Sequence, residues 1–344
     1  MAGRSGRATT QLQTLCDLFR GAGYPVISAS ALPNRLIRLV HIVATVIRRR
    51  SNIDILIVDV FSGASFVVAD VASILGKCFG KPIVMVLRGG ALPQFMIRFP
   101  RWTKRVLRRA DAMIAPSEFL ARVVAEQGLK PRVIPNVIDL SVYPYCHRTK
   151  VSPRLFWMRS FHSMYNPSMA VRVVARLRST MPDTSLVMAG EDKGMQARVR
   201  QLTKELGLSS AVRFPGVLDI EGKAREGNAA DIFLITNRVD NMPVTAVEAC
   251  AMGMPVVATA VGGIPYLLKD GDTGLLVPDD SDEAMASAIH RLINEPGLAR
   301  RLSTNGRKLA ERSSREQILP MWERMFSELG KGSITRDWAR TGEK

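Results

Sequence analysis

Apolar residues along this chain alternate between short β-branched runs and longer stretches in which apolar positions recur with helical spacing. Such alternation is typical of parallel strands that are joined by helices. The strand-like runs of the first half lie at 24–30, 53–60, 81–88, 111–117 and 131–136. Those of the second half lie at 154–160, 184–190, 211–217, 230–236, 254–260 and 273–280. The pattern therefore predicts two parallel α/β sheets in succession.

Two such sheets indicate two domains, and 344 residues accommodate two cores at roughly 150 residues each. Proline, aromatic and polar residues break the pattern at 143–152. We therefore expect a first domain over 1–148, a second over 149–330 and a frayed polar tail over 331–344. An open α/β domain usually begins with a buried strand, whereas this chain begins MAGRSGRATT. We expect the first strand to be missing; the alternative is a flexible tail before a complete domain.

Charge is unevenly divided between the halves. Residues 1–150 hold 22 basic and 8 acidic side chains, and residues 151–344 hold 26 and 23. The basic half fits an anionic membrane surface, a phosphorylated substrate or nucleic acid. No zinc-finger, RRM or homeodomain pattern accompanies the charge, so nucleic acid is not an expected partner. The four cysteines lie far apart and the apolar stretches fall short of about 18 residues. Both observations favour a reduced cytoplasmic setting without a membrane span.

Two acids eight positions apart, Asp240 and Glu248, accompany a predicted helix that starts near Pro243. Eight helical residues span about 12 Å and return to within about 80° of the same face. A carboxylate accepts two O–H bonds, so the pair suits the hydroxyl pairs of a ribose and a hexose. Alternatively, Asp240 only caps the helix and Glu248 is solvated.

A glycine turn and an arginine end two other strand-like runs. Gly262 and Gly263 follow the run at 254–260 and begin a predicted helix. Backbone N–H groups at the start of a helix can bind a phosphate. Alternatively, the glycines only let the chain bend. Arg159 directly follows the apolar residues LFWM, 155–158, of the run at 154–160. A guanidinium there could bind a departing diphosphate, or alternatively form a surface ion pair. Because the carboxyl ends of parallel strands form the ligand crevice of such sheets, we expect one site.

The stretch EACAMGMPVVATAVGGIPYLLKDGDTGLLV resembles the signature of the nucleotide-sugar glycosyltransferase family that includes sucrose synthase, glycogen synthase and mannosyltransferases of lipopolysaccharide assembly. The likeness covers nearly the whole chain, from GRSGRATTQLQTL through PNVIDLSVY, RSFHSMYNP and ADIFLITNRVDNMPVTAVEA. It implies the GT-B fold, in which two Rossmann-like, doubly wound parallel-sheet domains face a cleft. It also implies sugar transfer with retention at the anomeric carbon.

The resemblance assigns roles to individual residues. In the family two acids separated by seven residues bind the donor, the first on the sugar and the second on the ribose, and these fall on Asp240 and Glu248. The diphosphate clamp is an Arg, matched by Arg159, followed about five residues later by a Lys, a region where this chain has Met164, Tyr165 and Asn166. Many members place a His after the strand that corresponds to 82–87, where this chain has Arg88. We expect Arg88 to supply the missing charge.

The remaining donor-binding candidates are Gly190, Met242, Pro243, Gly262 and Gly263. We expect no metal and no cofactor, since the acidic run at 279–283 is typical of a helix start. Two alternatives to a transferase stay open. One is a sugar-nucleotide epimerase or phosphorylase on a similar fold. The other is a catalytically impaired sugar-nucleotide-binding protein, because the expected Lys and His are absent.

The segment 95–109, FMIRFPRWTKRVLRR, interleaves aromatic and aliphatic residues with six basic ones. This pattern predicts a helix that lies on an anionic membrane surface, or alternatively an ordinary amphipathic helix that covers the sheet. A second candidate is RLIRLVHIVATVIRRR at 35–50. An acceptor carried on a lipid pyrophosphate would account for both segments, and the expected acceptor is a glycan or a lipid-linked one. The sequence thus predicts a cytoplasmic glycosyltransferase, peripheral on the inner face of the membrane, in polysaccharide or glycolipid synthesis.

Overall fold

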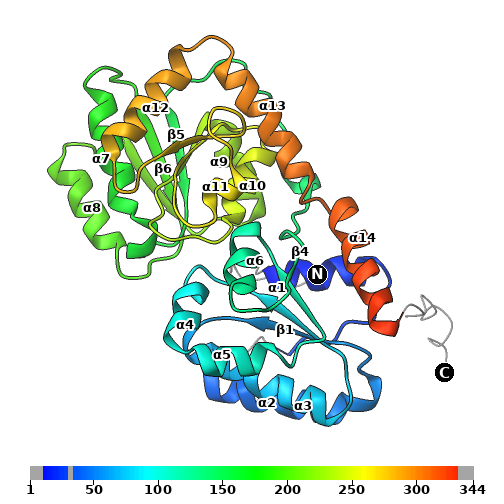
Figure 1. Cartoon of the computed structure of the whole chain (residues 1–344). Coiled ribbons are helices and arrows are strands. Elements are labelled where there is room, and N and C mark those ends of the chain that lie inside the picture. The colour runs from blue at the N-terminus through cyan, green and yellow to red at the C-terminus, as the bar shows by residue number, and fades with distance from the viewer. Residues whose placement is uncertain (1–10, 30–33, 332–344) are drawn as a thin grey trace. The chain divides into compact units, whose positions relative to one another are not determined.

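The computed structural model describes residues 11–29 and 34–331, which form two compact units (Figure 1). The C-terminal unit is Ile138–Ser314, and the N-terminal unit combines residues up to Val137 with the segment that begins at Arg315. These bounds differ from the domains expected at 1–148 and 149–330, because the last helices divide between the two cores.

The C-terminal unit contains a sheet of six parallel strands in the order β10-β9-β8-β5-β6-β7. The strands are β5 (Arg154–Met158), β6 (Ser185–Ala189), β7 (Val212–Gly216), β8 (Ile232–Ile235), β9 (Val256–Thr259) and β10 (Leu275–Val277). The helices are α7 (Pro167–Arg178), α8 (Gln196–Glu205), α9 (Ile220–Ala229), α10 (Val244–Ala251), α11 (Ile264–Leu267), α12 (Asp282–Asn294) and α13 (Leu298–Glu311).

Both faces of this sheet are buried. Along β5, Leu155 and Trp157 belong to one hydrophobic cluster, whereas Phe156 and Met158 belong to another. The first cluster includes side chains of α7 and α12, and the second includes side chains of α10. This alternation is that of a doubly wound sheet, and it explains why the strands read as continuous apolar runs.

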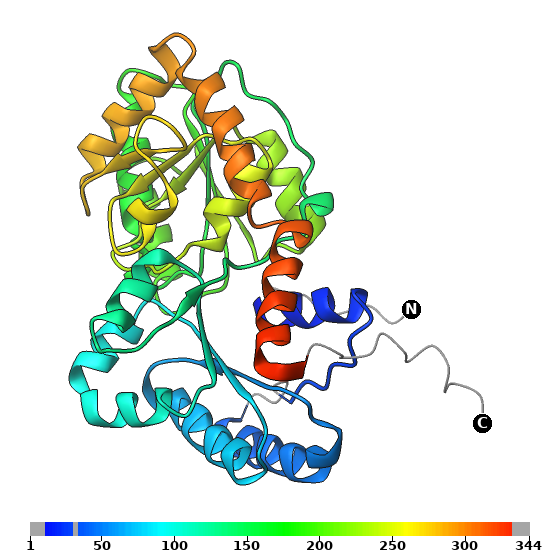
Figure 2. The same ribbon diagram turned by 45° about the vertical axis from the view of Figure 1, so that its right-hand side comes forward.

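The N-terminal unit has four parallel strands in the order β1-β2-β3-β4. They are β1 (Leu56–Val60), β2 (Ile83–Leu87), β3 (Ala112–Ala115) and β4 (Arg132–Val133). The helices are α1 (Gln11–Gly21), α2 (Arg35–Arg49), α3 (Phe66–Cys78), α4 (Leu92–Arg98), α5 (Pro100–Leu107), α6 (Glu118–Ala125) and α14 (Arg315–Phe326). Helices α1 and α14 lie side by side and share a cluster in which the rings of Phe19 and Trp322 are 5.4 Å apart (Figure 2).

The predicted fold class, two α/β domains in succession that are each built on a parallel sheet, is confirmed. Two local predictions are wrong. Residues 24–29 form no strand, because Tyr24 and Val26 pack against the cluster shared by α1 and α14 without pairing their backbone in the sheet. The segment 95–109 is two helices rather than one, since α4 ends before Phe99 and Pro100 begins α5. The expectation of a missing first strand concerns residues 1–10, and the frayed tail concerns 332–344; both lie outside the described residues.

Most apolar side chains of 95–109 face the core. Met96, Val106 and Leu107 are buried. Trp102 packs edge-on against Phe66 and donates its Nε1–H to Asp70 at 2.6 Å. The segment therefore behaves as the alternative predicts, as amphipathic helices that cover the sheet. In the described part of the chain, no helix combines the length and the apolar character that crossing a membrane requires.

Candidate functional site

The strand order of the C-terminal unit reverses between β5 and β8. From β5 the chain proceeds through β6 and β7 on one side, and from β8 through β9 and β10 on the other. In open α/β sheets this reversal opens a crevice at the carboxyl ends of the two strands, because the connections leave in opposite directions. Arg159 directly follows β5, and the segment 236–243 directly follows β8. The topology thus brings together two predicted elements of the site.

Arg159 is held from several sides. Its backbone N–H donates to the carbonyl of Ala189 at 3.1 Å, and its guanidinium lies 4.3 Å from the ring centroid of Tyr165. Nη2 forms a short ion pair with the carboxylate of Asp240. The Nε atom is buried and has no hydrogen-bond partner among the described residues. The guanidinium is therefore fixed in orientation while part of its donor capacity is unused.

Asp240 precedes helix α10 rather than belonging to it. Pro243 has extended backbone (φ −69°, ψ 105°) and is the N-cap, so the helix begins only at Val244. The predicted helical spacing of the two acids is therefore wrong. Asp240 accepts a hydrogen bond from Asn237 Nδ2 at 2.7 Å, and both residues are buried. Met242 is buried in the hydrophobic cluster beneath α10.

Glu248 lies on α10 and is 6% exposed, so it is not solvated. Its Oε1 accepts two hydrogen bonds, from the hydroxyl of Tyr143 at 2.6 Å and from Lys223 Nζ at 2.9 Å. Its Oε2 is buried without a partner among the described residues. Burial, reinforced by the charge of Glu248, raises the pKa of Tyr143 well above its ordinary value, so the phenol remains a donor. The contacts orient one carboxylate oxygen and leave the other available.

The three predicted glycines have a backbone reason to be glycine. A Cβ on Gly190 (φ +149°) would lie 1.8 Å from the carbonyl oxygen of Arg159. Cβ atoms on Gly262 and Gly263 would lie 2.2 Å and 1.7 Å from the carbonyl oxygens of Asp240 and Asn241. The Gly263 N–H donates to the Asp240 carbonyl at 2.9 Å, so this amide is already used. These glycines let the segments that carry Arg159 and Asp240 approach closely, which favours the bending interpretation over direct phosphate contacts.

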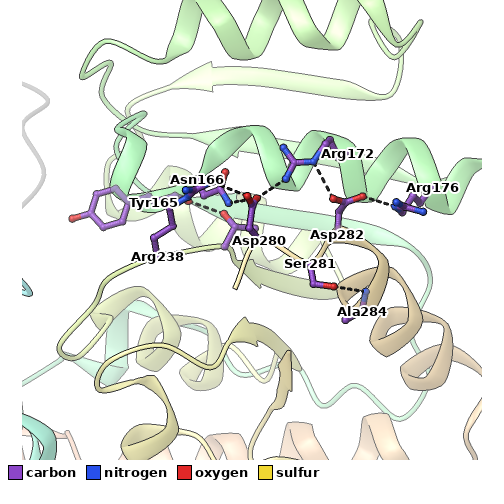
Figure 3. Close-up of polar contacts among 10 residues, drawn as sticks. Tyr165, Asn166, Arg172, Arg176, Arg238, Asp280, Ser281, Asp282 and Ala284 are labelled. Atoms are coloured by element: carbon purple, nitrogen blue, oxygen red, sulfur yellow. Dashed lines mark hydrogen bonds and ion pairs between the residues drawn. The ribbon is translucent and has the colours of Figure 1, made fainter. Parts of the chain in front are cut away.

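The loop after β5 is tied to the loop after β10 by a charged network (Figure 3). Asp280 accepts hydrogen bonds from Asn166 at 2.8 Å, Arg172 at 2.6 Å and Arg238 at 2.8 Å. The Asn166 hydrogen bond, helped by the two guanidinium groups, lowers the pKa of Asp280 below its ordinary range. The backbone N–H of Arg238 donates to the carbonyl of Met164 at 2.8 Å. Arg238 therefore lies beside Met164, in the region where the family resemblance calls for a lysine.

Arg88 belongs to the N-terminal unit and follows β2, as predicted. It is 8% exposed and is held by Asp59 of β1 at 3.1 Å and by a short hydrogen bond to Asn136. A shallow pocket beside it is lined by residues that include Gln11, Leu15, Val86, Ile114 and Trp322. Its predicted catalytic role stays a prediction. Within residues 11–29 and 34–331, no three His, Cys, Asp or Glu side chains are grouped as a metal site would require.

Comparison with known proteins decides the family. Residues 149–309 match the model of glycosyl transferases group 1, and residues 5–142 match that of glycosyltransferase family 4. The chain belongs to the nucleotide-sugar glycosyltransferases of GT-B fold. The two matches include the predicted site residues of each unit, Arg88 in one and Arg159 through Gly263 in the other. The predicted resemblance is thus confirmed.

Among curated glycosyltransferases, the chain is similar to D-inositol 3-phosphate glycosyltransferase of Streptomyces bingchenggensis, with 30% identity over 42% of this chain and 32% of that protein. It is 26% identical to glycogen synthase of Mycobacterium tuberculosis over 73% of this chain and 64% of that enzyme. The chain thus spans from about a third to just under two thirds of the length of these relatives.

Two solved structures share the fold over nearly the whole chain. HepE of Anabaena, in complex with UDP and glucose, has a TM-score of 0.75 at 18% identity. The match covers 95% of this chain and 98% of HepE. Sucrose-phosphate synthase of Thermosynechococcus elongatus has a TM-score of 0.74 at 19% identity, with 94% of this chain and 93% of that enzyme covered. At these identities the likeness concerns the fold.

Proposed function

We propose that this glycosyltransferase moves a sugar from a nucleotide-sugar donor to a glycan or lipid-linked acceptor, with retention at the anomeric carbon. We place the reaction in the cytoplasm, in the synthesis of cell-surface polysaccharide or glycolipid. One observation carries the proposal. Three buried polar atoms of the site have no hydrogen-bond partner among the described residues: Glu248 Oε2, Asn237 Oδ1 and Arg159 Nε.

Leaving a buried polar atom without a partner costs about 1–3 kcal/mol, so each of these three atoms calls for an explanation. Glu248 Oε2 and Asn237 Oδ1 accept hydrogen bonds, whereas Arg159 Nε donates one. A ligand that satisfies all three brings hydroxyl donors together with an anionic acceptor. A nucleotide sugar has both, in its ribose and hexose hydroxyls and in its diphosphate. This match supports the donor assignment.

In the proposed reaction the anomeric C–O bond to the diphosphate breaks, and the acceptor hydroxyl forms the new bond on the same face of the sugar while its proton passes to the departing diphosphate oxygen. Arg159 would stabilise the charge that develops on the leaving diphosphate, and one preorganised donor of this kind is worth roughly 10²–10³ in rate. Asp240, which pairs with Arg159, would receive the sugar hydroxyls. Arg238, whose backbone contacts Met164, would add positive charge on the lysine side of the clamp if its guanidinium leaves Asp280 when the donor binds.

Donor binding is tested first. The protein is screened by thermal shift against UDP-, GDP- and ADP-sugars, and hits are measured by calorimetry; a ligand at 100 times its Kd adds about 2.7 kcal/mol of stability. We expect Glu248→Gln to weaken binding of the best donor at least tenfold, because the variant loses the charge that strengthens hydrogen bonds from hydroxyls. The matched control is Glu283→Gln, at an exposed glutamate of α12. A folded Glu248→Gln protein with wild-type affinity contradicts the site.

Turnover separates the transferase from the alternatives. We expect Arg159→Gln to reduce kcat about 10²–10³-fold with the fold intact, and the product anomer, read by NMR, to match that of the donor. Donor binding without release of nucleoside diphosphate would favour the catalytically impaired binding protein. Conversion of the bound sugar while it stays attached to the nucleotide would favour the epimerase.

A further inference from the structure

Helix α2 of the N-terminal unit, Arg35–Arg49, has apolar residues on two sides. On one side Val46 is buried, and the helix packs beside α3 (Figures 1 and 2). On another side Leu36, Ile37 and Val40 are 76%, 58% and 67% exposed, and Ile47 continues the same stripe at 39%. A helix on the surface of a globular protein normally presents polar residues to water. This second apolar stripe is therefore unexplained by packing within the described chain.

The stripe is regular along the helix. At 100° per residue, positions 36, 40 and 47 fall within about 40° of one another, and position 37 extends the same face. The helix is well formed at this end, since the Asn34 side chain accepts hydrogen bonds from the backbone N–H groups of Leu36 and Ile37. The apolar side chains are thus held on a capped, ordered turn.

The charged residues of this segment all have one sign. Residues 34–50 contain five arginines and no acidic residue. Arg48, Arg49 and Arg50 are exposed, and in the described chain none of the three forms an ion pair with a carboxylate. Pairing of this surface with the same surface of a second copy would bring these arginines together. An anionic lipid surface instead complements their charge and accepts the apolar side chains.

We propose that α2 docks this protein on anionic lipid bilayers. The stripe of Leu36, Ile37, Val40 and Ile47 enters the region between head groups and acyl chains. Arg48, which borders the stripe, contacts the head groups, and the other arginines add attraction to the anionic surface. This assignment differs from the segment 95–109, whose apolar residues largely pack into the core. It rests on the exposed face of α2 alone and does not depend on the proposed transfer reaction.

The test is co-sedimentation of the full chain with vesicles of phosphatidylcholine alone and of phosphatidylcholine with 30% phosphatidylglycerol. We expect at least tenfold stronger partition into the anionic vesicles. The triple variant Leu36→Ser, Ile37→Ser, Val40→Ser should weaken this partition at least tenfold, and Arg48→Gln with Arg49→Gln should remove most of the preference for anionic lipid. The matched control is Ile97→Ser, which alters an equally exposed residue (75%) of the other basic segment and should leave partition unchanged.

Three outcomes would overturn the proposal: equal binding to both vesicles, wild-type partition of the triple variant, or an equal loss in Ile97→Ser. A fourth is a dimer of the wild-type chain in light scattering that the triple variant abolishes without any change in lipid binding, since the stripe would then serve a second copy. Far-UV circular dichroism and unfolding midpoints confirm that each variant is folded. Because the substituted side chains are exposed, we expect their midpoints to stay close to wild type.

Discussion

Tyr143→Phe isolates a single hydrogen bond to the buried acid of the site. The Tyr143 ring packs in the hydrophobic cluster beneath α10, and phenylalanine preserves that ring. The variant removes only the 2.6 Å hydrogen bond from the phenol to Glu248 Oε1, while Lys223 remains at 2.9 Å. A hydrogen bond to a charged group contributes about 1.5–3 kcal/mol. Because Lys223 still compensates the carboxylate, we expect a loss near the lower end, about 1.5–2 kcal/mol.

The assay is urea unfolding followed by tryptophan fluorescence, to which Trp157, buried in the same unit, contributes. For a unit of this size the loss corresponds to a melting temperature lowered by about 3–8 °C, at roughly 2–4 °C per kcal/mol. The matched control is Tyr145→Phe, at a tyrosine that is 42% exposed, and it should change stability by less than about 0.5 kcal/mol. Wild-type stability of Tyr143→Phe, or an equal loss in the control, would refute the reasoning.

The same variant has a pH signature. Since the folded protein raises the pKa of Tyr143 above its ordinary value of about 10, the stabilisation is complete below pH 10. Above pH 10 the unfolded phenol ionises while the folded one keeps its proton, so stability is lost by up to about 1.4 kcal/mol per pH unit. The difference between wild type and Tyr143→Phe should therefore shrink between pH 9 and pH 11. A constant difference over this range would contradict a buried, protonated phenol.

Three further outcomes are expected. Gly190→Ala should lower stability by about 2–4 kcal/mol in urea unfolding, because its Cβ would collide with the Arg159 carbonyl at a backbone angle that side chains disfavour; a loss under 1 kcal/mol would contradict this. Asp280→Asn should be less stable than wild type at pH 6, and the two proteins should converge in stability below pH 3. The hydrogen bond from Asn166 is the first cause that lowers the pKa of Asp280 in the folded protein. The ionised carboxylate therefore stabilises the fold above about pH 3.9, and this stabilisation is lost as the pH falls. Burial raises the pKa of Cys250 to about 12, so a thiol reagent should modify two thiols promptly in the native protein and all four in denaturant, the prompt ones being Cys78 and Cys146.

The fold was largely predictable because both faces of each sheet are buried, which makes the strands read as continuous apolar runs such as Leu155–Met158. The failure at 24–29 has the same origin. Tyr24 and Val26 alternate like a strand because their side chains are partly buried, but helices rather than a neighbouring strand provide their contacts. Hydrophobic periodicity records which side chains are buried and does not record whether the backbone finds a strand partner.

Candidate residues could be picked out from the sequence where they directly follow strands, as Arg159 does, or lie on a recognisable signature, as Glu248 does; their roles stay predictions. Asn237 carried a usable signal, since it stands just after β8 and three residues before Asp240. Tyr143 and Lys223 carried none. They lie 105 and 25 residues from Glu248 in sequence, and only the tertiary fold brings α9, which carries Lys223, and the segment before β5, which carries Tyr143, to its carboxylate.

The N-terminal unit is built from two separate stretches of the chain, and this affects the order in which the two units are completed during synthesis. Phe19, near the start, has its aromatic partners Trp322 and Phe326 on α14, at the other end of the chain. A ribosome must therefore translate the entire C-terminal unit before it releases the side chains that close this cluster. The C-terminal unit, continuous from Ile138 to Ser314, has all its residues available earlier. During translation the first unit to begin is thus the last to be finished, and the apolar face of α1 depends on other protection until α14 emerges.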